Sequence, residues 1–332
     1  VGMNATRAYT TKYFKKLTVG RVQTPTLAML VERAGQISNF QKEKYFNVEL
    51  DCDGIPAVKP KIFDPDEAEQ LRSRCQGSEA IVTAVKETEK KVKAPKLYDL
   101  TTLQREANRI YGMTAKQTLD TAQSLYEKKL ITYPRTDSQY LTEDMEQTAR
   151  NVVRQIYEKY QLTGPFDQPE QPDVKKVMNN SKVTDHHAII PTLELASCHL
   201  DELKSWEEKI LFLIAVHTVM AMSKDHIYQE TEIEVECQEE IFKAKGKIVL
   251  QDGWKLFENC FKNKDRMAIV DPDQEMKERM PKVTQGQTFY AVDAEKTEHF
   301  TSPPKPYSED TLLAAMETAG NKEFDEDTEK KG

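Results

Sequence analysis

The stretch Ile131–Ser138, which reads ITYPRTDS, is the most informative segment of the sequence. It follows a predicted helix that ends at Leu130. Proline stops a helix and biases the residue before it toward an extended backbone, so Tyr133 is expected to project from a turn. Arg135 lies two residues further on and would share a face with Tyr133 in an extended segment.

A tyrosine and an arginine on one face suggest phosphate chemistry. A free tyrosine ionises near pH 10, so only about 0.1% is phenolate at neutral pH. A neighbouring guanidinium favours the phenolate and can also bind a phosphate through two hydrogen bonds. Tyr133 is therefore a candidate nucleophile for a phosphodiester, with Arg135 as its charge stabiliser. Taken alone, however, the segment is more typical of a buried tyrosine in an ordinary turn.

Two other segments contain candidate phosphate ligands. Gly20–Pro25, which reads GRVQTP, forms a loop before a predicted helix, with Thr24 as its cap, and helix N-termini bind phosphate through free N–H groups. Asp185–Thr192, which reads DHHAIIPT, places His186 and His187 before an apolar stretch. A histidine pair could bind a metal, but no third ligand is in register. A hydrogen bond to a phosphate oxygen is the better interpretation.

The spacing of apolar residues along the sequence changes four times, and the order of the changes predicts nested structural units. Residues 1–42 have helical spacing, residues 45–95 read as strands, residues 97–225 are helical again, and residues 226–300 return to strands. Helical spacing resumes from Tyr307. This order predicts a helical unit inserted into a β unit, which is itself inserted into a helical unit.

Local signals place several of these elements. Residues 45–52 alternate between apolar and polar side chains, and Asp53-Gly54 supplies a turn. Capping-box patterns begin at Thr114, with Gln117, and at Ser205, with Glu208. Thr142 is the expected cap of the helix between them.

The composition limits which class of protein the chain can belong to. The chain has 332 residues, enough for two or three structural units, and its 38% hydrophobic and 31% charged residues are typical of a soluble globular protein. No apolar run approaches the ~20 residues of a membrane helix, and no signal peptide is recognisable. The five cysteines include no CxxC pair, which argues against a zinc ribbon or a redox motif and fits a reducing cytoplasm.

The charge distribution leaves room for a local nucleic-acid groove. The net charge of −8 argues against a general nucleic-acid coat. Residues 1–31, however, contain five basic residues and no acidic one, with Tyr9, Tyr13 and Phe14 among them. Basic residues interleaved with aromatic residues can follow a phosphate backbone and stack on bases, although a solvated helix face fits equally well.

Together these segments resemble a known family. ITYPRTDS, GRVQTP and DHHAIIPT resemble motifs of the type IA DNA topoisomerases and, within them, the bacterial topoisomerase III branch. Val1–Arg7 and Pro303–Glu309 also fit, and the five segments follow the family's order over essentially the whole chain. Each motif is modest alone, but five in order are specific.

The resemblance implies roles for individual residues. Tyr133 is similar to the nucleophile that forms a 5′-phosphotyrosyl link, Arg135 to its phosphate partner, and His186 to the histidine that contacts the scissile phosphate. The expected residues for binding single-stranded DNA are Arg7, Thr18, Val19, Gly20, Arg21, Val22 and Gln23.

The resemblance also implies a multidomain α and β fold with a toroidal core. A helical gate-base domain would comprise residues 1–42 and 301–332, and a β arch domain would comprise residues 43–96 and 226–300. A helical domain over residues 97–225 would contain the nucleophile. Hinges are expected near residues 96 and 226, where the texture changes.

Family members bind Mg²⁺ in a Toprim domain, which precedes these segments. The chain is expected to begin after that domain and to stop before the family's gate-base domain ends. Asp271–Glu275 (DPDQE) imitates the acidic magnesium motif, but it lies far beyond Tyr133 and lacks the preceding glutamate, so a solvated turn is expected there. No metal site is expected in this chain. We expect an incomplete enzyme that binds single-stranded DNA weakly and does not cleave it alone.

The implied reaction of the complete enzyme is ATP-independent cleavage, strand passage and religation, with relaxation or decatenation as the result. The absence of a GxxxxGK[ST] nucleotide loop agrees with this. We expect a cytoplasmic, nucleoid-associated monomer with single-stranded DNA as its partner and no membrane contact. Two alternatives remain open at this point: a single-stranded DNA-binding module that uses Tyr133 for stacking, and an interaction fragment without a DNA role.

Overall fold

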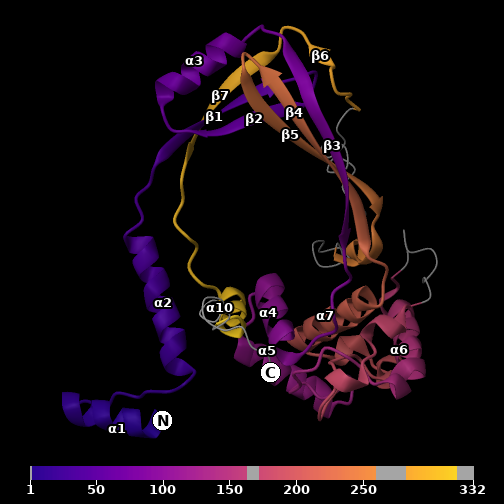
Figure 1. Cartoon of the computed structure of the whole chain (residues 1–332). Helices are drawn as coiled ribbons and strands as arrows, with labels where there is room; N and C mark the ends of the chain where they lie inside the picture. Colours follow the sequence, from indigo (N-terminus) through magenta and orange to yellow (C-terminus); the bar gives the residue numbers. More distant parts are fainter. Residues whose placement is uncertain (1, 163–171, 259–281, 320–332) are drawn as a thin grey trace. The chain divides into compact units, whose positions relative to one another are not determined.

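The computed structural model describes residues 2–162, 172–258 and 282–319, and these form two compact units. The first unit comprises residues 1–44 and 300–332, and the second comprises residues 45–299. Figure 1 shows the elements of both. Because their relative placement is not determined, each unit is described by itself.

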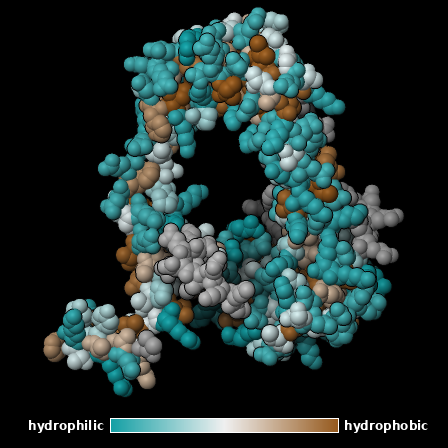
Figure 2. All heavy atoms as spheres, viewed as in Figure 1, coloured by the Kyte–Doolittle hydropathy of each residue, from teal (hydrophilic) through white to brown (hydrophobic). Residues whose placement is uncertain are grey.

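The first unit is helical, as its sequence predicts. Its helices are α1 (Gly2–Tyr13), α2 (Gln23–Ser38) and α10 (Glu309–Glu317). The Arg33 guanidinium joins α2 to the segment before α10: it donates a 2.7 Å hydrogen bond to the Lys305 carbonyl and lies 4.2 Å from the Tyr307 ring centroid. None of the three helices buries a residue fully, and Leu27 and Val31 of α2 are 60% and 63% exposed. Brown patches along α2 in Figure 2 mark such side chains.

The predicted capping role of Thr24 is wrong. Helix α2 begins at Gln23, and Val22 before it makes no side-chain cap hydrogen bond. Thr24 already lies in the first turn, where its hydroxyl accepts a 3.2 Å hydrogen bond from the Gly20 N–H. The threonine thus stabilises the preceding loop.

The second unit contains a seven-stranded sheet with the strand order β6-β3-β4-β5-β2-β1-β7. The strands are β1 (Lys44–Asp51), β2 (Pro56–Ile62), β3 (Ala80–Val92), β4 (His226–Cys237), β5 (Glu240–Gln251), β6 (Thr288–Phe289) and β7 (Asp293–Phe300). The alternation predicted for β1 is confirmed, because Phe46, Val48, Leu50 and Cys52 are all buried in the core of the sheet.

The expectation of strands throughout residues 45–95 is wrong in one place. Helix α3 (Pro65–Cys75) interrupts the strands and buries Ala68, Leu71 and Cys75 against the sheet. The Asp64 carboxylate caps it by accepting hydrogen bonds from the N–H groups of Asp66 and Glu67. Proline at the first helical position and acidic residues in the first turn are helix-start signals.

Strands β3 and β4 pair along most of their length, although residues 93–225 lie between them in sequence. Val92 at the end of β3 pairs with His226 at the start of β4, and Figure 1 shows the two strands side by side. The Asp225 carboxylate accepts a 3.1 Å hydrogen bond from the Ala94 N–H and lies 3.2 Å from the Lys91 ammonium and 3.3 Å from that of Lys176. The chain therefore leaves the sheet and returns to it at one point.

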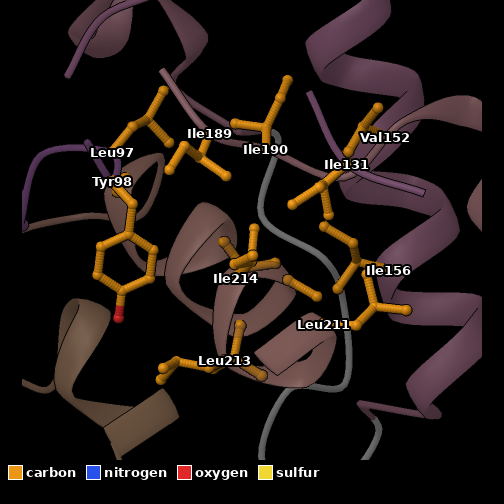
Figure 3. Packing of buried hydrophobic residues seen from close by; sticks show 14 of the residues in the cluster. Leu97, Tyr98, Ile131, Val152, Ile156, Ile189, Ile190, Leu211, Leu213 and Ile214 are labelled. Carbon is orange, nitrogen blue, oxygen red and sulfur yellow. The ribbon is translucent and has the colours of Figure 1, made fainter. Parts of the chain in front are cut away.

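Residues 97–222 form a helical region with its own hydrophobic core. Its helices are α4 (Leu100–Tyr111), α5 (Ala115–Glu127), α6 (Glu146–Tyr160) and α7 (Ser205–Ala221), with short 3₁₀ turns η1 (Glu143–Met145), η2 (Val174–Val177), η3 (Asn180–Lys182), η4 (Leu193–Ala196) and η5 (Leu200–Glu202), and a further turn η6 (Gly253–Glu258) follows β5. Helix α7 is buried on every side from Ile210 to Ala221. Figure 3 shows Leu211, Leu213 and Ile214 of this helix among the packed side chains. Of the helices in the described ranges, none is long and apolar enough to cross a membrane.

The caps predicted in this region have mixed outcomes. The Thr114 and Gln117 capping box is confirmed. The predicted Ser205 box is wrong by one residue, because the Lys204 N–H donates to the Glu207 carboxylate at 3.0 Å. Thr142 precedes η1 and makes no side-chain cap hydrogen bond, so its predicted role is also wrong.

Candidate functional site

The segment that contains Tyr133 is held beside the segment that contains the two histidines. The Thr132 N–H donates to the Ile190 carbonyl at 3.0 Å, and the Thr132 hydroxyl donates to the Ala188 carbonyl at 2.9 Å. The Ile190 N–H donates back to the Thr132 hydroxyl at 3.0 Å. Ile131 and Ile190 also lie near each other in the core shown in Figure 3. Residues 58 positions apart are thus fixed in register by backbone pairing.

Thr136 fixes the other end of the Tyr133 segment to the segment that contains the two histidines. Its side chain is 7% exposed, and its hydroxyl donates a 3.0 Å hydrogen bond to the His186 carbonyl. The hydroxyl also accepts a 3.1 Å hydrogen bond from the Ser138 N–H. The Thr136 carbonyl accepts a 3.0 Å hydrogen bond from the Leu100 N–H at the start of α4. Because Tyr133 lies between Thr132 and Thr136, it is anchored on both sides.

These anchors bring the rings of Tyr133 and His186 together. The ring centroids are 4.4 Å apart and the ring planes meet at 47°. Tyr126, near the end of α5, packs edge-on against Tyr133 with centroids 5.3 Å apart and planes at 75°. Tyr133 is half-buried and His186 is exposed, so an exposed imidazole lies beside a partly accessible phenol.

The two adjacent histidines have different environments. A ring nitrogen of His187, Nδ1, lies 2.9 Å from the Ala188 carbonyl oxygen, so it donates a hydrogen bond to that oxygen. The His187 side chain is half-buried. His186 makes no comparable ring hydrogen bond within the described part of the chain, and its imidazole is available to a ligand. The structure therefore distinguishes the two members of the pair.

Arg135 lies on the same segment and has an exposed side chain. The backbone bends at Pro134 and Arg135, whereas the sequence predicts an extended segment with Arg135 on the face of Tyr133. Pro134 is buried and the Arg135 side chain is exposed. Within residues 2–162, 172–258 and 282–319, the guanidinium forms no hydrogen bond or ion pair.

An ion pair between a buried carboxylate and a partly exposed lysine anchors the end of α5, the helix that leads into the site. Glu207 at the start of α7 is 3% exposed. Its carboxylate accepts hydrogen bonds from the Lys128 ammonium at 2.6 Å and from the Ser124 hydroxyl at 2.7 Å, both at the end of α5. Burial alone would raise the pKa of Glu207, but the hydrogen bonds from Lys128, Ser124 and the Lys204 N–H outweigh it and lower the pKa to about 2.

The residues expected to bind DNA all belong to the first unit. The loop between α1 and α2 is fixed by Thr6, whose hydroxyl accepts a 2.9 Å hydrogen bond from the Val19 N–H. A side chain at Gly2 would approach the Val19 carbonyl to 3.0 Å. Five of the expected residues have exposed side chains, while Val19 and Gly20 are partly covered; the exposed ones are Arg7, Thr18, Arg21, Val22 and Gln23.

The described residues do not provide an evident metal site. No group of three or more His, Cys, Asp or Glu side chains in the described ranges could hold a metal ion. The DPDQE stretch at Asp271–Glu275 lies outside those ranges.

Comparison with known proteins identifies the family of the chain. A family model described as "DNA topoisomerase" matches residues 1–320, so the chain belongs to the DNA topoisomerase family. The expected placement among the type IA enzymes, on the bacterial topoisomerase III branch, is confirmed by relatives named DNA topoisomerase 3. The protein of Bacillus licheniformis is 38% identical over 96% of this chain and 44% of its own length. That of Bacillus subtilis is also 38% identical, over 96% of this chain and 44% of its own length.

A solved structure supports the same relationship. Full-length topoisomerase I from Thermotoga maritima matches with a TM-score of 0.65 and 26% sequence identity, over 92% of this chain and 49% of that one. The chain thus spans less than half the length of the curated relatives described above.

The sequence interpretation misses two residues that shape the site. Tyr126 contacts the Tyr133 ring, and its only signal is a position one residue after the buried Leu125 in α5. Thr136 belongs to the tyrosine motif but has no predicted role in it, since nothing local indicates that its hydroxyl bonds to a carbonyl 50 residues away.

Proposed function

We propose that this chain provides the strand-cleaving centre of a type IA DNA topoisomerase, with Tyr133 as the nucleophile. The observation that carries the proposal is the contact between Tyr133 and the exposed His186, 4.4 Å apart between ring centroids. Family membership supplies the reaction class: reversible cleavage of one DNA strand without ATP.

The proposed reaction is a transesterification. The Tyr133 phenol oxygen attacks a backbone phosphorus of single-stranded DNA, a tyrosyl O–P bond forms, and the bond from phosphorus to the 3′ oxygen breaks. The phenolic proton is lost to solvent and the leaving 3′ oxygen is protonated, which leaves a 3′-hydroxyl end and a 5′-phosphotyrosyl end. One phosphodiester replaces another, so the step is close to energy-neutral and its reversal religates the strand.

Two neighbouring side chains have proposed roles in this step. The His186 imidazole donates a hydrogen bond to a non-bridging oxygen of the scissile phosphate, where negative charge develops. Arg135, exposed and without an ion-pair partner in the described ranges, binds the same phosphate through its guanidinium. Because Arg135 is not bonded to Tyr133 beforehand, the phosphate itself would join the two side chains.

The proposal extends to the arrangement of domains. Residues 97–225 form the helical domain that contains the nucleophile, residues 43–96 with 226–300 form the β arch, and residues 1–42 with 301–332 form the gate base of a toroidal core. Separate hydrophobic cores for the helical region and the sheet support the division. Single-stranded DNA would bind along the loop at Thr18–Gln23 and at Arg7. Movement at the junction near residues 96 and 226 would open a gate for strand passage, in relaxation or decatenation.

Magnesium is part of the proposed chemistry of the complete enzyme, where it would stabilise phosphate charge. The described residues do not fit a magnesium site, since none of them form a suitable cluster. We also propose that the enzyme acts in the cytoplasm as a monomer.

Covalent trapping tests the proposal. The protein encoded by the complete reading frame that contains this sequence is incubated with a labelled single-stranded oligonucleotide and Mg²⁺ and then denatured. A covalent adduct is expected with the wild type and with Tyr126→Phe, the matched control for a nearby ring, and none with Tyr133→Phe. Equal non-covalent binding by all three proteins without any adduct would instead support a single-stranded DNA-binding module.

A further inference from the structure

Tyr140 lies between two lysine side chains that come from different segments. The Lys96 ammonium is 5.6 Å from the centroid of the Tyr140 ring, and the Lys182 ammonium is 5.2 Å from it. Both lysines are exposed and Tyr140 is half-buried. Cation–π contacts at exposed sites contribute about 0.5–1 kcal/mol each, which is enough to bias where the ammonium groups lie.

The backbones of these three residues are fixed to the frame that also holds the candidate nucleophile. The Tyr140 carbonyl accepts a 2.9 Å hydrogen bond from the Ala188 N–H. The Lys182 carbonyl accepts a 2.8 Å hydrogen bond from the Ser138 hydroxyl. The Lys96 carbonyl lies 2.7 Å from Nε2 of the buried His217, which donates to it. Tyr140 lies seven positions after Tyr133, so their Cα atoms are at most about 25 Å apart.

Neither lysine has a carboxylate partner in the part of the chain that the structure describes. Within the described ranges, neither Lys96 nor Lys182 forms an ion pair, although the exposed carboxylates of Asp137 and Asp185 belong to the same segments. Other exposed lysines of the chain, such as Lys243 and Lys245, do pair with glutamates across the strands. Two cations that lie at one aromatic ring and lack an ion-pair partner among the described residues fit an anion with repeated charges better than they fit a structural role.

We propose that Lys96, Lys182 and Tyr140 form a phosphate clamp that binds single-stranded DNA beside the cleavage centre, away from the phosphate that reacts. The ammonium groups bind backbone phosphates, and the Tyr140 ring holds them in position before the strand arrives. The inference rests on the proposed function, because the identity of the ligand comes from it. It adds a second phosphate-binding site, which determines the path of the DNA strand past Tyr133.

Salt dependence tests the clamp directly. Binding of a labelled single-stranded oligonucleotide by the same complete protein is measured by fluorescence anisotropy at several salt concentrations. Each lysine that binds a phosphate adds about 0.7 to the slope of log affinity against log salt, so the double variant Lys96→Ala, Lys182→Ala is expected to lower that slope by roughly 1.4. Lys247→Ala is the matched control, since Lys247 lies 4.2 Å from the Tyr228 ring on the sheet. It should bind like the wild type.

Variants of Tyr140 separate positioning from a general loss of charge. Tyr140→Phe keeps the ring and is expected to bind like the wild type. Tyr140→Leu removes both cation–π contacts and is expected to bind about 5- to 30-fold more weakly, the fold-change that corresponds to two such contacts. Thermal melting monitors folding, and a Lys→Gln pair replaces the alanine pair if the latter melts early.

The outcomes distinguish the two proposals. If the double variant has the same salt slope as Lys247→Ala and the protein still forms the covalent adduct, the clamp is wrong and the proposed function stands. A wild type that neither binds single-stranded DNA nor forms the adduct overturns both.

Discussion

The hydroxyl of Thr136 donates a hydrogen bond to the backbone carbonyl of His186 at 3.0 Å, and this bond links the two sides of the candidate site. We expect Thr136→Val, which has nearly the same shape, to destabilise the protein by about 1–3 kcal/mol, because it leaves the His186 carbonyl and the Ser138 N–H without their partner. Denaturant unfolding measures this effect. Thr142→Val is the control, since Thr142 makes no side-chain cap hydrogen bond. A Thr136→Val variant as stable as that control would contradict the prediction.

Replacement of His186 should affect chemistry more than binding. If its imidazole stabilises the developing charge on the phosphate, His186→Ala should slow formation of the covalent adduct by about 10²–10³-fold. Rapid-quench measurements of adduct formation, together with oligonucleotide binding, separate the two effects. His187→Ala serves as the control, because the His187 ring is directed to the Ala188 carbonyl. Equal rates for the two variants would remove His186 from the proposed mechanism.

The lowered pKa of Glu207 predicts a loss of stability in acid. The carboxylate ionises near 4.5 when unfolded and near 2 when folded, so its contribution is complete above about pH 5 and disappears as the pH falls toward 2. A shift of this size corresponds to about 3 kcal/mol. The free energy of unfolding of Glu207→Gln should therefore depend less on pH in this window than that of the wild type. The exposed Glu194→Gln is the control and should retain the wild-type dependence.

Gly253 should tolerate no side chain. Its φ is +55°, and an added Cβ would lie 2.3 Å from the Asp225 carbonyl oxygen at the junction between the sheet and the helical region. Gly112 has a similar φ of +67° but open space around it, so Gly112→Ala should cost only the left-handed strain of about 1–2 kcal/mol. Gly253→Ala should be clearly less stable than Gly112→Ala in chemical denaturation. Equal stability of the two variants would show that the backbone at the junction can shift to accommodate the added Cβ atom.

Regular elements are largely predictable from the sequence, because their signals are local. Alternation in β1 and the helical spacing of α6 correspond to buried faces, and the strongly apolar stretch of α7 corresponds to a helix buried on every side. The prediction of strands over residues 45–95 passes over helix α3, although Asp64 and Pro65 signal its start and Ala68, Leu71 and Cys75 have helical spacing. The predicted Ser205 cap is misplaced by one residue, an error within the usual uncertainty of helix ends.

The geometry of the site is harder to predict from the sequence than the helices and strands around it. Tyr133 and His186 are identified separately from their motifs, and the resemblance to a family links them. The ring contact itself depends on hydrogen bonds between irregular segments, such as that between Thr132 and Ile190, which have no periodic signal. The bend at Pro134 and Arg135 likewise has no periodic signal in the sequence.

The pairing of Val92 with His226 has a consequence for the order of folding. Strands β3 and β4 are neighbours, yet they cannot pair until the two ends of a long intervening segment meet, and closing a long loop of disordered chain costs entropy. If the helical region folds first around its own core, its ends arrive together and the strands can pair as a hairpin would. The helical region would then act as the nucleus for the sheet, and its amides would gain protection from hydrogen exchange before those of β3 and β4.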